Sequence, residues 1–210
     1  MNAKEVFIVG YSGHAFVVYN SLLKMGLKVA GYIDMWPKEF NPFQLDYICD
    51  DDNIEKIRNL KSYEYFLAMG DNSIREKLYL KYSEIMEKAP MNVIHPGSII
   101  SIGVEMGNGI FISANACINP LSKIGNGVIC NTGSIIEHDC QIGDFSHIAP
   151  GAVLCGNVII GSNSFIGANS VVRQGIKIGN NVTIGAGSVI VKNIENSSVV
   201  VGNPQRRLWK

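Results

Sequence analysis

A six-residue repeat runs through the second half of the chain and limits the fold more than any other feature. Starting at Ile94, every sixth residue is apolar as far as Ile190. A fixed hexapeptide period is typical of a parallel β-helix, in which each hexad supplies one short strand and one corner. Because three such sides close a coil, we expect the chain to return to the same side every eighteen residues.

Glycines recur at this longer period, each between an apolar residue and a small polar one. They are Gly107, Gly125, Gly143, Gly161 and Gly179. We expect them to mark one corner on successive coils, where backbone crowding or a positive φ favours glycine. The period holds from about residue 94 to 195, so no long loop should leave the coils. A β-sandwich, the alternative, needs turns at irregular spacing.

The first ninety residues follow a different pattern, in which apolar runs alternate with helical spacing. The apolar runs predict strands over 6–9, 28–33 and 65–69, and the helical stretches are 14–25, 53–60 and 71–88. The segment 35–52 is interpreted as irregular. Alternating strands and helices predict a small, Rossmann-like parallel α/β sheet. We therefore predict two domains, α/β over 1–93 and all-β over 94–210.

Composition argues against several functions. The 210-residue chain has a formal net charge of zero, which does not favour nucleic acid or an anionic membrane as partner. No apolar run reaches the ~18 residues of a membrane-spanning helix, and the short polar start Met1–Glu5 predicts no signal peptide. The five cysteines, without a Cys-x-x-Cys pair, are expected to be reduced thiols of a cytoplasmic protein.

A glycine loop follows the first predicted strand and opens the first helix. It runs Gly10, Tyr11, Ser12, Gly13, His14. Free N–H groups at a helix start attract a phosphate, and Asp34, at the end of the next strand, is placed to accept bonds from a sugar or a base. The competing interpretation is a tight turn and a solvated strand end. A third glycine is missing, which weakens the case for a dinucleotide cofactor or an oxidoreductase.

Two histidines, His138 and His147, lie at outward positions of the repeat. We expect them to flank the corner at Gly143 on a wall that no loop of the same chain crosses, so that a neighbouring subunit completes the pocket. His138 stands between Glu137 and Asp139, and Asn131 lies seven residues earlier. Carboxylates on both sides of a histidine suit a general base, although surface polar residues would give the same pattern. Zinc, as in the γ-class carbonic anhydrases, needs a third histidine ligand, so no metal is expected.

These motifs together resemble the NeuD/PglD-like sugar acetyltransferases over essentially the whole length. The segments that carry the resemblance are Gly10–Ala15, Gly31–Asp34, Gly70–Arg75, Ile94–Pro96, Asn131, Glu137–Asp139, Ser146–His147 and Gly202–Pro204. The resemblance implies a left-handed β-helix, a homotrimer and acetyl-CoA bound between adjacent helices. It also implies that the amino-terminal domain holds a nucleotide-linked 4-amino sugar (UDP-, GDP- or dTDP-linked). The residues that it places around the nucleotide are Gly10, Ser12, Gly13, His14 and Asp34.

The same resemblance implies direct acetyl transfer to the sugar amine, with His138 as general base and Glu137 or Asp139 as its partner. Asn131, His147 and Gly156 are then contacts to acetyl-CoA or the acceptor, and Arg206 and Arg207 contact CoA. A backbone N–H between 143 and 161 would stabilise the oxyanion. Two alternatives remain open: an O-acetyltransferase acting on a sugar hydroxyl, of the sialic-acid type, and a non-catalytic trimeric scaffold that binds nucleotide sugars.

Overall fold

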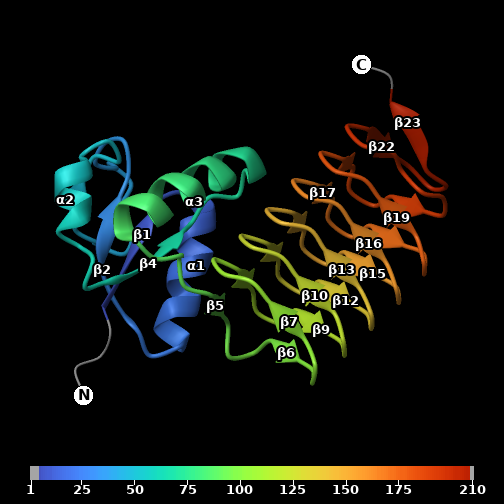
Figure 1. The fold of residues 1–210 in the computed structure, drawn as a ribbon, viewed down its shortest axis with the longest axis horizontal. Coiled ribbons are helices and arrows are strands. Elements are labelled where there is room, and N and C mark those ends of the chain that lie inside the picture. Colours follow the sequence, from blue (N-terminus) through green and yellow to red (C-terminus); the bar gives the residue numbers. More distant parts are fainter. Residues whose placement is uncertain (1–4, 209–210) are drawn as a thin grey trace.

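Four parallel strands form the sheet of the amino-terminal part of the computed structural model, which describes residues 5–208 (Figure 1). Their order across the sheet is β3-β2-β1-β4. The strands are β1 (Glu5–Val9), β2 (Lys28–Ile33), β3 (Tyr47–Cys49) and β4 (Glu64–Leu67). The helices are α1 (Gly13–Lys24), α2 (Ile54–Arg58) and α3 (Asn72–Met86). The predicted Rossmann-like α/β class is confirmed.

The helices begin where the capping residues predict. The Asn53 side chain accepts the Lys56 N–H at 3.1 Å at the start of α2. The Asp71 carboxylate accepts the Ile74 N–H at 2.9 Å at the start of α3. Each oxygen satisfies one of the N–H groups that a helix leaves without a partner in its first turn.

Strand β3 is not expected from the sequence, because the segment 35–52 has no regular pattern. It pairs in parallel with β2, with Tyr32 opposite Tyr47 and Ile33 opposite Cys49. The interpretation of this whole segment as irregular is therefore wrong. A three-residue strand at a sheet edge is too short for an alternating pattern to reveal it.

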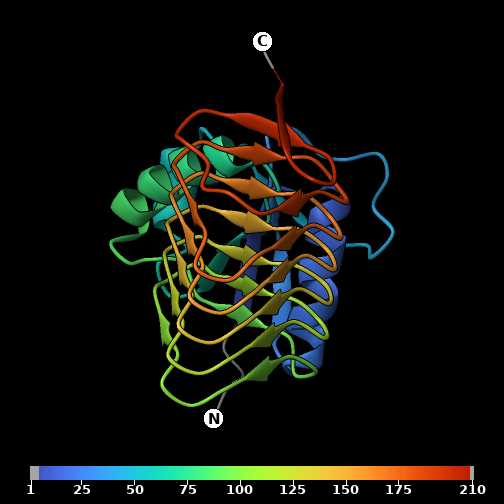
Figure 2. The same cartoon turned by 90° about the vertical axis from the view of Figure 1, so that its right-hand side faces the viewer.

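Short strands, of two residues and six positions apart from β5 to β21, build the rest of the chain into a left-handed parallel β-helix with three flat faces, as the family resemblance implies (Figure 2). Face 1 contains β5 (Val93–Ile94), β8 (Phe111–Ile112), β11 (Ile129–Cys130), β14 (His147–Ile148), β17 (Phe165–Ile166), β20 (Thr183–Ile184), β22 (Val199–Val201) and β23 (Arg206–Leu208). Face 2 contains β6 (Ile99–Ile100), β9 (Cys117–Ile118), β12 (Ile135–Ile136), β15 (Val153–Leu154), β18 (Val171–Val172) and β21 (Val189–Ile190). Face 3 contains β7 (Glu105–Met106), β10 (Lys123–Ile124), β13 (Gln141–Ile142), β16 (Ile159–Ile160) and β19 (Lys177–Ile178).

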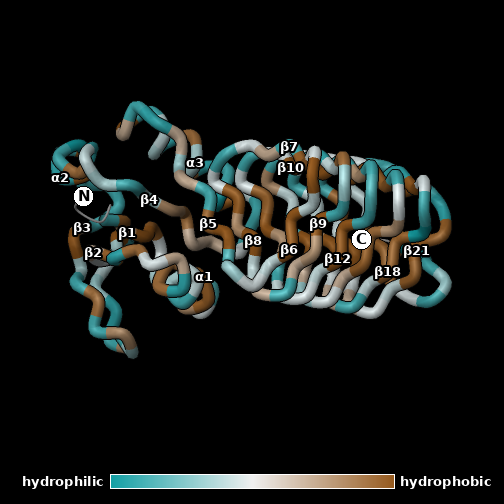
Figure 3. The backbone as a smooth tube through the Cα atoms, turned by 90° about the horizontal axis from the view of Figure 1, so that it is seen from below, coloured by the Kyte–Doolittle hydropathy of each residue, from teal (hydrophilic) through white to brown (hydrophobic). Residues whose placement is uncertain are grey.

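The core of the solenoid is a column of apolar side chains, most of them from the second position of a strand. Ile136, Leu154 and Val172 are completely buried on face 2, each above its counterpart in the coil before. Figure 3 shows hydrophobic positions recurring along the coils. Since burial of one such side chain stabilises a fold by about 1.5–3 kcal/mol, the column is the main source of the solenoid's stability.

Crowding, not a positive φ, explains the glycines spaced eighteen apart. A Cβ atom on Gly143 would lie 2.6 Å from the Ser162 backbone nitrogen of the next coil, and no positive φ occurs there. At three of these corners the side chain after the glycine, that of Asn126, Asp144 or Asn180, bonds to the coil before it; Asp144 Oδ1, for example, accepts the Asn126 N–H at 2.7 Å. The corner between faces 3 and 1 therefore leaves no room for a side chain at the glycine.

The last coil is shorter than the others. Ile178 bridges to Ile194 and Ile184 pairs with Val200, in each case sixteen residues on instead of eighteen. The expectation that the period holds to residue 195 is thus wrong after Ile190. Strand β23 then runs antiparallel to β22 and closes the stack.

The α/β layer packs on face 1 of the solenoid (Figure 1). Phe66 of β4 shares a buried cluster with Phe111 and Ile129 of face 1. Among residues 5–208, no helix has both the length and the apolarity needed to span a bilayer.

Candidate functional site

His138 stands at the corner between faces 2 and 3, just after β12. Its side chain is 61% exposed, and its Nδ1 atom lies 2.8 Å from Asp139 Oδ2. Asp139 has a φ of 60°, a left-handed conformation that aspartate tolerates better than most residues. A carboxylate can only accept, so Nδ1 carries the hydrogen and Nε2 keeps a lone pair for a substrate. Of the two candidate partners, Asp139 is the one whose carboxylate contacts the ring.

Gly156, in the next coil, lies directly against this ring. A Cβ atom there would come within 2.6 Å of both Cε1 and Nε2 of His138. Within the described residues, the Gly156 N–H donates to no protein acceptor. An unused backbone donor thus lies beside the atom that would accept a proton.

His147 occupies a different surface. It belongs to β14 on face 1, is only 7% exposed, and is covered by the chain's own amino-terminal layer. Its Nε2 lies 3.0 Å from the Asn131 Nδ2 atom, and its Nδ1 lies 3.4 Å from the Gly70 carbonyl oxygen. The expectation that no part of the same chain crosses this wall is therefore wrong. The sequence repeat gives the outward direction of a side chain but not what lies against it.

The two histidines consequently do not meet within one chain. His138 precedes β13, and the whole of face 3 separates it from the Gly143 corner that it was expected to flank. Asn131 lies at the corner between faces 1 and 2. The structure brings together His138 with Asp139 and Gly156, and separately Asn131 with His147.

The glycine loop opens α1 without a side-chain cap. Ser12 is the N-cap residue, but its side chain makes no capping bond, and both Ser12 and Gly13 are exposed. A Cβ atom on Gly13 would meet nothing within 4 Å. Gly10 has a structural role, because its φ is +84° and a Cβ there would collide with the Met69 side chain. The start of the helix therefore presents free N–H groups to solvent.

Asp34 links the glycine loop to its own loop at the carboxyl edge of the sheet. Its carboxylate accepts the Tyr11 N–H at 2.9 Å and the Met35 N–H at 2.8 Å. Lys38 Nζ forms an ion pair with it at 2.8 Å. A carboxylate has about four lone-pair sites, so one remains for a ligand hydroxyl, and a second becomes available if Lys38 moves away.

His14 faces His147 across the boundary between the two layers. Their ring centroids are 6.5 Å apart. Burial, together with the positive charge of Arg75, lowers the pKa of His14 to about 4 and that of His147 to about 3. Both rings are therefore neutral near pH 7. His14 Nε2 is buried and has no hydrogen-bond partner within residues 5–208.

Arg75 lies at the centre of this boundary and is 1% exposed. In the sequence, Arg75 belongs to the segment Gly70–Arg75 that carries part of the family resemblance, and no role is predicted for it. The sequence does contain a sign of this role, because Arg75 lies one turn into the predicted helix, at a position where an apolar residue would be expected to face the core.

Two of the five cysteines, Cys130 and Cys140, are buried and unsuited to act as nucleophiles. All five are free thiols. Burial raises the pKa of Cys130 to about 12 and that of Cys140 to about 11, so both stay protonated.

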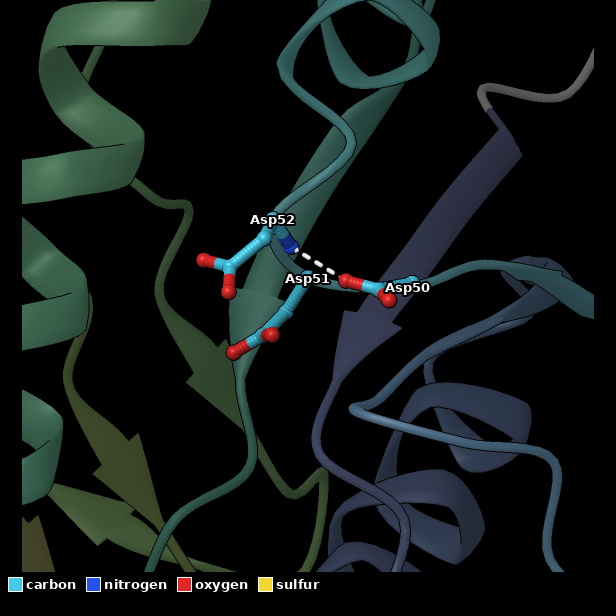
Figure 4. Close-up of side chains that lie close together, drawn as sticks. All are labelled: Asp50, Asp51 and Asp52. Atoms are coloured by element: carbon cyan, nitrogen blue, oxygen red, sulfur yellow. Dashed lines mark hydrogen bonds between the residues drawn. The ribbon is translucent and has the colours of Figure 1, made fainter.

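Two further charged groups lie away from the histidines. Arg206 and Arg207 are exposed on β23 at the far end of the solenoid (Figure 1), with Arg207 Nη1 4.0 Å from Glu195 Oε2. The acidic run 50–52 precedes α2 (Figure 4). There the Asp52 N–H donates to Asp50 Oδ1 at 2.7 Å, and Asp52 pairs with Lys81 at 2.8 Å. Turn formation and this ion pair account for the acidic run.

Comparisons with known proteins agree with this architecture. Residues 5–82 match the family described as PglD N-terminal domain, and residues 157–192 match the hexapeptide repeat of succinyl-transferase. Perosamine N-acetyltransferase from Caulobacter crescentus, solved with CoA and GDP-perosamine, has 32% sequence identity and a TM-score of 0.92. The similarity covers 98% of this chain and 97% of that one.

A second similar structure is the acetyltransferase domain of PglB from Neisseria gonorrhoeae in complex with acetyl coenzyme A. It has 30% identity and a TM-score of 0.91, covering 99% of this chain and 100% of that one. WeeI from Acinetobacter baumannii, at 24% identity and a TM-score of 0.86, shares the fold over 98% of this chain and 100% of its own. The chain therefore belongs to the PglD-like sugar N-acetyltransferases, CoA-dependent enzymes that join a Rossmann-like domain to a left-handed β-helix of hexapeptide repeats.

Proposed function

We propose that this enzyme transfers the acetyl group of acetyl-CoA to the 4-amino group of a nucleotide-linked deoxy sugar, with His138 as general base. One observation carries the proposal: an exposed histidine is oriented by Asp139 and lies beside the unused N–H of Gly156. The similar Caulobacter enzyme, whose name gives its reaction as N-acetylation, binds GDP-perosamine and CoA.

The chemistry follows from this arrangement. The neutral sugar amine attacks the thioester carbonyl, and a tetrahedral intermediate forms. The Gly156 N–H donates to its oxyanion, while His138 Nε2 removes the amine proton. The carbon–sulfur bond then breaks, CoA leaves as the thiol with that proton, and the amide remains on the sugar. Glu137 is adjacent to the histidine but does not orient it.

The separation of the two histidines supports a site shared between subunits. His138 faces away from the amino-terminal layer of its own chain, which covers face 1. Face 2 exposes apolar side chains at Ile99, Ile135 and Val171, which are suited to contact a second copy. A homotrimer would bring His138 of one protomer to the acceptor held by the amino-terminal domain of its neighbour.

The remaining contacts follow from position and charge. Gly10, Ser12, Gly13, His14 and Asp34 would surround the nucleotide, since they line the carboxyl edge of the sheet. Asn131 and His147 would face the acetyl group or the acceptor, and Arg206 and Arg207 would bind CoA phosphates. We place the reaction in the cytoplasm, where thiols stay reduced.

The test is a panel of acceptors. The purified protein is incubated with acetyl-CoA and UDP-, GDP- and dTDP-linked 4-amino sugars, each beside its 4-hydroxy counterpart. Thiol release and the mass of the product are measured. We expect acetylation of an amino sugar and a loss of about 100-fold or more in kcat for His138→Asn. Acetylation of the hydroxy sugars alone would show an O-acetyltransferase, and failure to bind acetyl-CoA would show a scaffold.

Mixed trimers test the shared site. His138→Asn chains are combined with chains carrying a substitution at the glycine loop, Gly13→Asp, which puts a carboxylate where the nucleotide phosphates would bind. Each variant alone is inactive under the proposal. A mixture that regains part of the wild-type rate supports a site built from two chains, and a mixture without activity contradicts it.

A further inference from the structure

Helix α3 lies along the solenoid corner that contains the glycines, and successive turns contact successive coils. Asn72 Nδ2 donates to the Ser164 carbonyl at 3.3 Å, and Tyr79 donates to Asn126 Oδ1 at 3.5 Å. The two ends of this contact are seven helical residues apart, or about 10 Å at 1.5 Å per residue. Two coil steps at about 4.8 Å cover nearly the same distance. The helix and the coils therefore stay in register.

Arg75 occupies the middle of this contact and uses all five of its N–H groups. Every acceptor is an uncharged oxygen. The bonds run to Gly127 O at 2.7 Å, Phe145 O at 2.7 Å, Asn72 Oδ1 at 2.9 Å, Met69 O at 3.0 Å and Gly70 O at 3.1 Å. Two acceptors belong to the solenoid and three to the amino-terminal layer. A buried guanidinium with this many partners joins the two layers in one geometry.

One of these acceptors connects Arg75 to His147. The Gly70 carbonyl accepts from Arg75 and also lies 3.4 Å from His147 Nδ1. A carbonyl oxygen has no hydrogen to donate, so Nδ1 must carry the proton of the neutral ring. His147 Nε2 is then an acceptor, and the Asn131 Nδ2 atom at 3.0 Å is its donor.

The Asn131 amide is fixed from its other end as well. Its Oδ1 accepts the Thr132 N–H at 2.8 Å, which leaves only the NH₂ group to face the imidazole. Arg75, Gly70, His147 and Asn131 thus form one directed chain of hydrogen bonds from the amino-terminal layer to the corner between faces 1 and 2.

We infer that Arg75 is a positioning residue, which acts through the Gly70 carbonyl to hold His147 in its neutral Nδ1–H tautomer and the Asn131 amide in one orientation. The consequence for catalysis rests on the proposed function, because the amino-terminal layer would hold the sugar that Asn131 and His147 meet. Loss of the Arg75 hydrogen bonds should then weaken the binding of the acceptor sugar more than the binding of acetyl-CoA.

The charged groups around His147 agree with this role. His14 of α1 and Arg75 of α3 face the ring, whereas its neighbours on face 1, Ile129 and Phe165, carry no charge. Burial lowers the pKa of Arg75 only to about 10, so the guanidinium stays charged near pH 7 and opposes protonation of both histidines.

The first test needs no substrate. The full-length protein is labelled with ¹⁵N-histidine, and the tautomer of His147 is read by long-range ¹H–¹⁵N NMR between pH 5 and pH 8, with His147→Phe to assign its signals. We expect a single Nδ1–H tautomer that does not titrate in wild type. An Nε2–H tautomer, or titration near pH 6.5, would overturn the inference whether or not the chain is an acetyltransferase.

The second test uses variants. Arg75→Met removes the guanidinium. If this variant does not fold, Asn72→Ala takes its place, because it removes one of the acceptors of Arg75. We expect a mixture of His147 tautomers and a KM for the nucleotide sugar raised roughly tenfold, since a bond to a charged donor is worth at least that factor. The KM for acetyl-CoA should stay within about twofold.

Glu76→Gln is the matched control on the same helix. It changes the partner of Asn163, at 2.9 Å, without touching Arg75. It should leave the tautomer and both KM values unchanged. If folded Arg75→Met shows the wild-type tautomer and KM values, or if Glu76→Gln alters them to the same extent, Arg75 has only a general structural role.

Discussion

The carboxylate of Asp139 holds His138 through a single 2.8 Å contact at Nδ1, and it does so from a left-handed backbone position. The contact determines which ring nitrogen faces the solvent. Because the two residues are adjacent in sequence, the corner itself sets the pair, and no distant segment is needed to orient the ring.

Asp139→Asn should therefore lower kcat by roughly tenfold or more, a part of the ~10²–10⁴ that a general base contributes. Asparagine also tolerates the left-handed conformation, so the backbone is kept while the charge is lost. Steady-state rates with saturating acetyl-CoA and acceptor measure the effect. Glu137→Gln is the control, and we expect it to stay within about twofold; the reverse ranking would assign the orienting role to Glu137.

Gly156→Ala should reduce kcat by about 100-fold, because its Cβ would lie 2.6 Å from His138 Nε2 and displace the ring. The N–H of residue 156 is retained, so the loss reports on the histidine. A double-mutant cycle with His138→Asn checks this: Gly156→Ala should cost little once the histidine is absent. Fully additive losses would separate the two residues.

The crowded corner that contains the glycines spaced eighteen apart should respond to substitution differently from the corners at which a residue has a positive φ, such as Gly187. Gly161→Ala places a Cβ 2.5 Å from Asn180 Oδ1 and 2.6 Å from its backbone nitrogen, which we expect to cost about 1–3 kcal/mol of unfolding free energy. Gly187 has a φ of +67° and open space around it. Gly187→Asn should stay within about 0.5 kcal/mol, because asparagine occupies the equivalent position at Asn169. Chemical denaturation at a fixed protomer concentration compares them, and equal losses would refute crowding as the cause.

Stability should fall as the pH drops below about 6.5. The pKa of His14 and that of His147 lie near 4 and 3 in the folded chain, against an ordinary value of 6.5. Unfolding below pH 6.5 therefore takes up protons, and each histidine adds a slope of about 1.4 kcal/mol per pH unit. Denaturation between pH 7 and pH 5, where carboxylates remain ionised, measures the slope. His14→Asn should reduce it, and a flat profile for wild type would contradict the burial of neutral rings.

The sequence predicts regular features well because each rests on a local rule. The hexad from Ile94 to Ile190 locates the strands, and Asn53 and Asp71 locate two helix starts. The hexad rule fails in the last coil, where Ile178 bridges to Ile194 after sixteen residues instead of eighteen. The shorter coil belongs to the end of the solenoid, which the repeat does not describe. The local rules also miss β3, whose three residues pair only because β2 leaves an edge free.

The site is less predictable, since it depends on contacts between residues far apart in sequence. The motif Glu137–Asp139 makes His138 a candidate, and adjacency limits its carboxylate partner to Glu137 or Asp139, of which Asp139 makes the contact. His147 shows the limit: its outward direction follows from the repeat, but its cover by Gly70 and Arg75 comes from a segment about seventy residues earlier. No local pattern encodes that packing.

Each coil adds the same height to the solenoid, and this height determines how far apart two sites lie along its axis. Gly156 lies beside His138 at the corner between faces 2 and 3, whereas Arg206 and Arg207 lie on β23, at the end of face 1 and further along the solenoid axis. Each added or deleted coil would change this separation by about 4.8 Å. The number of coils therefore sets the distance along the solenoid axis between the corner at His138 and the two arginines of β23.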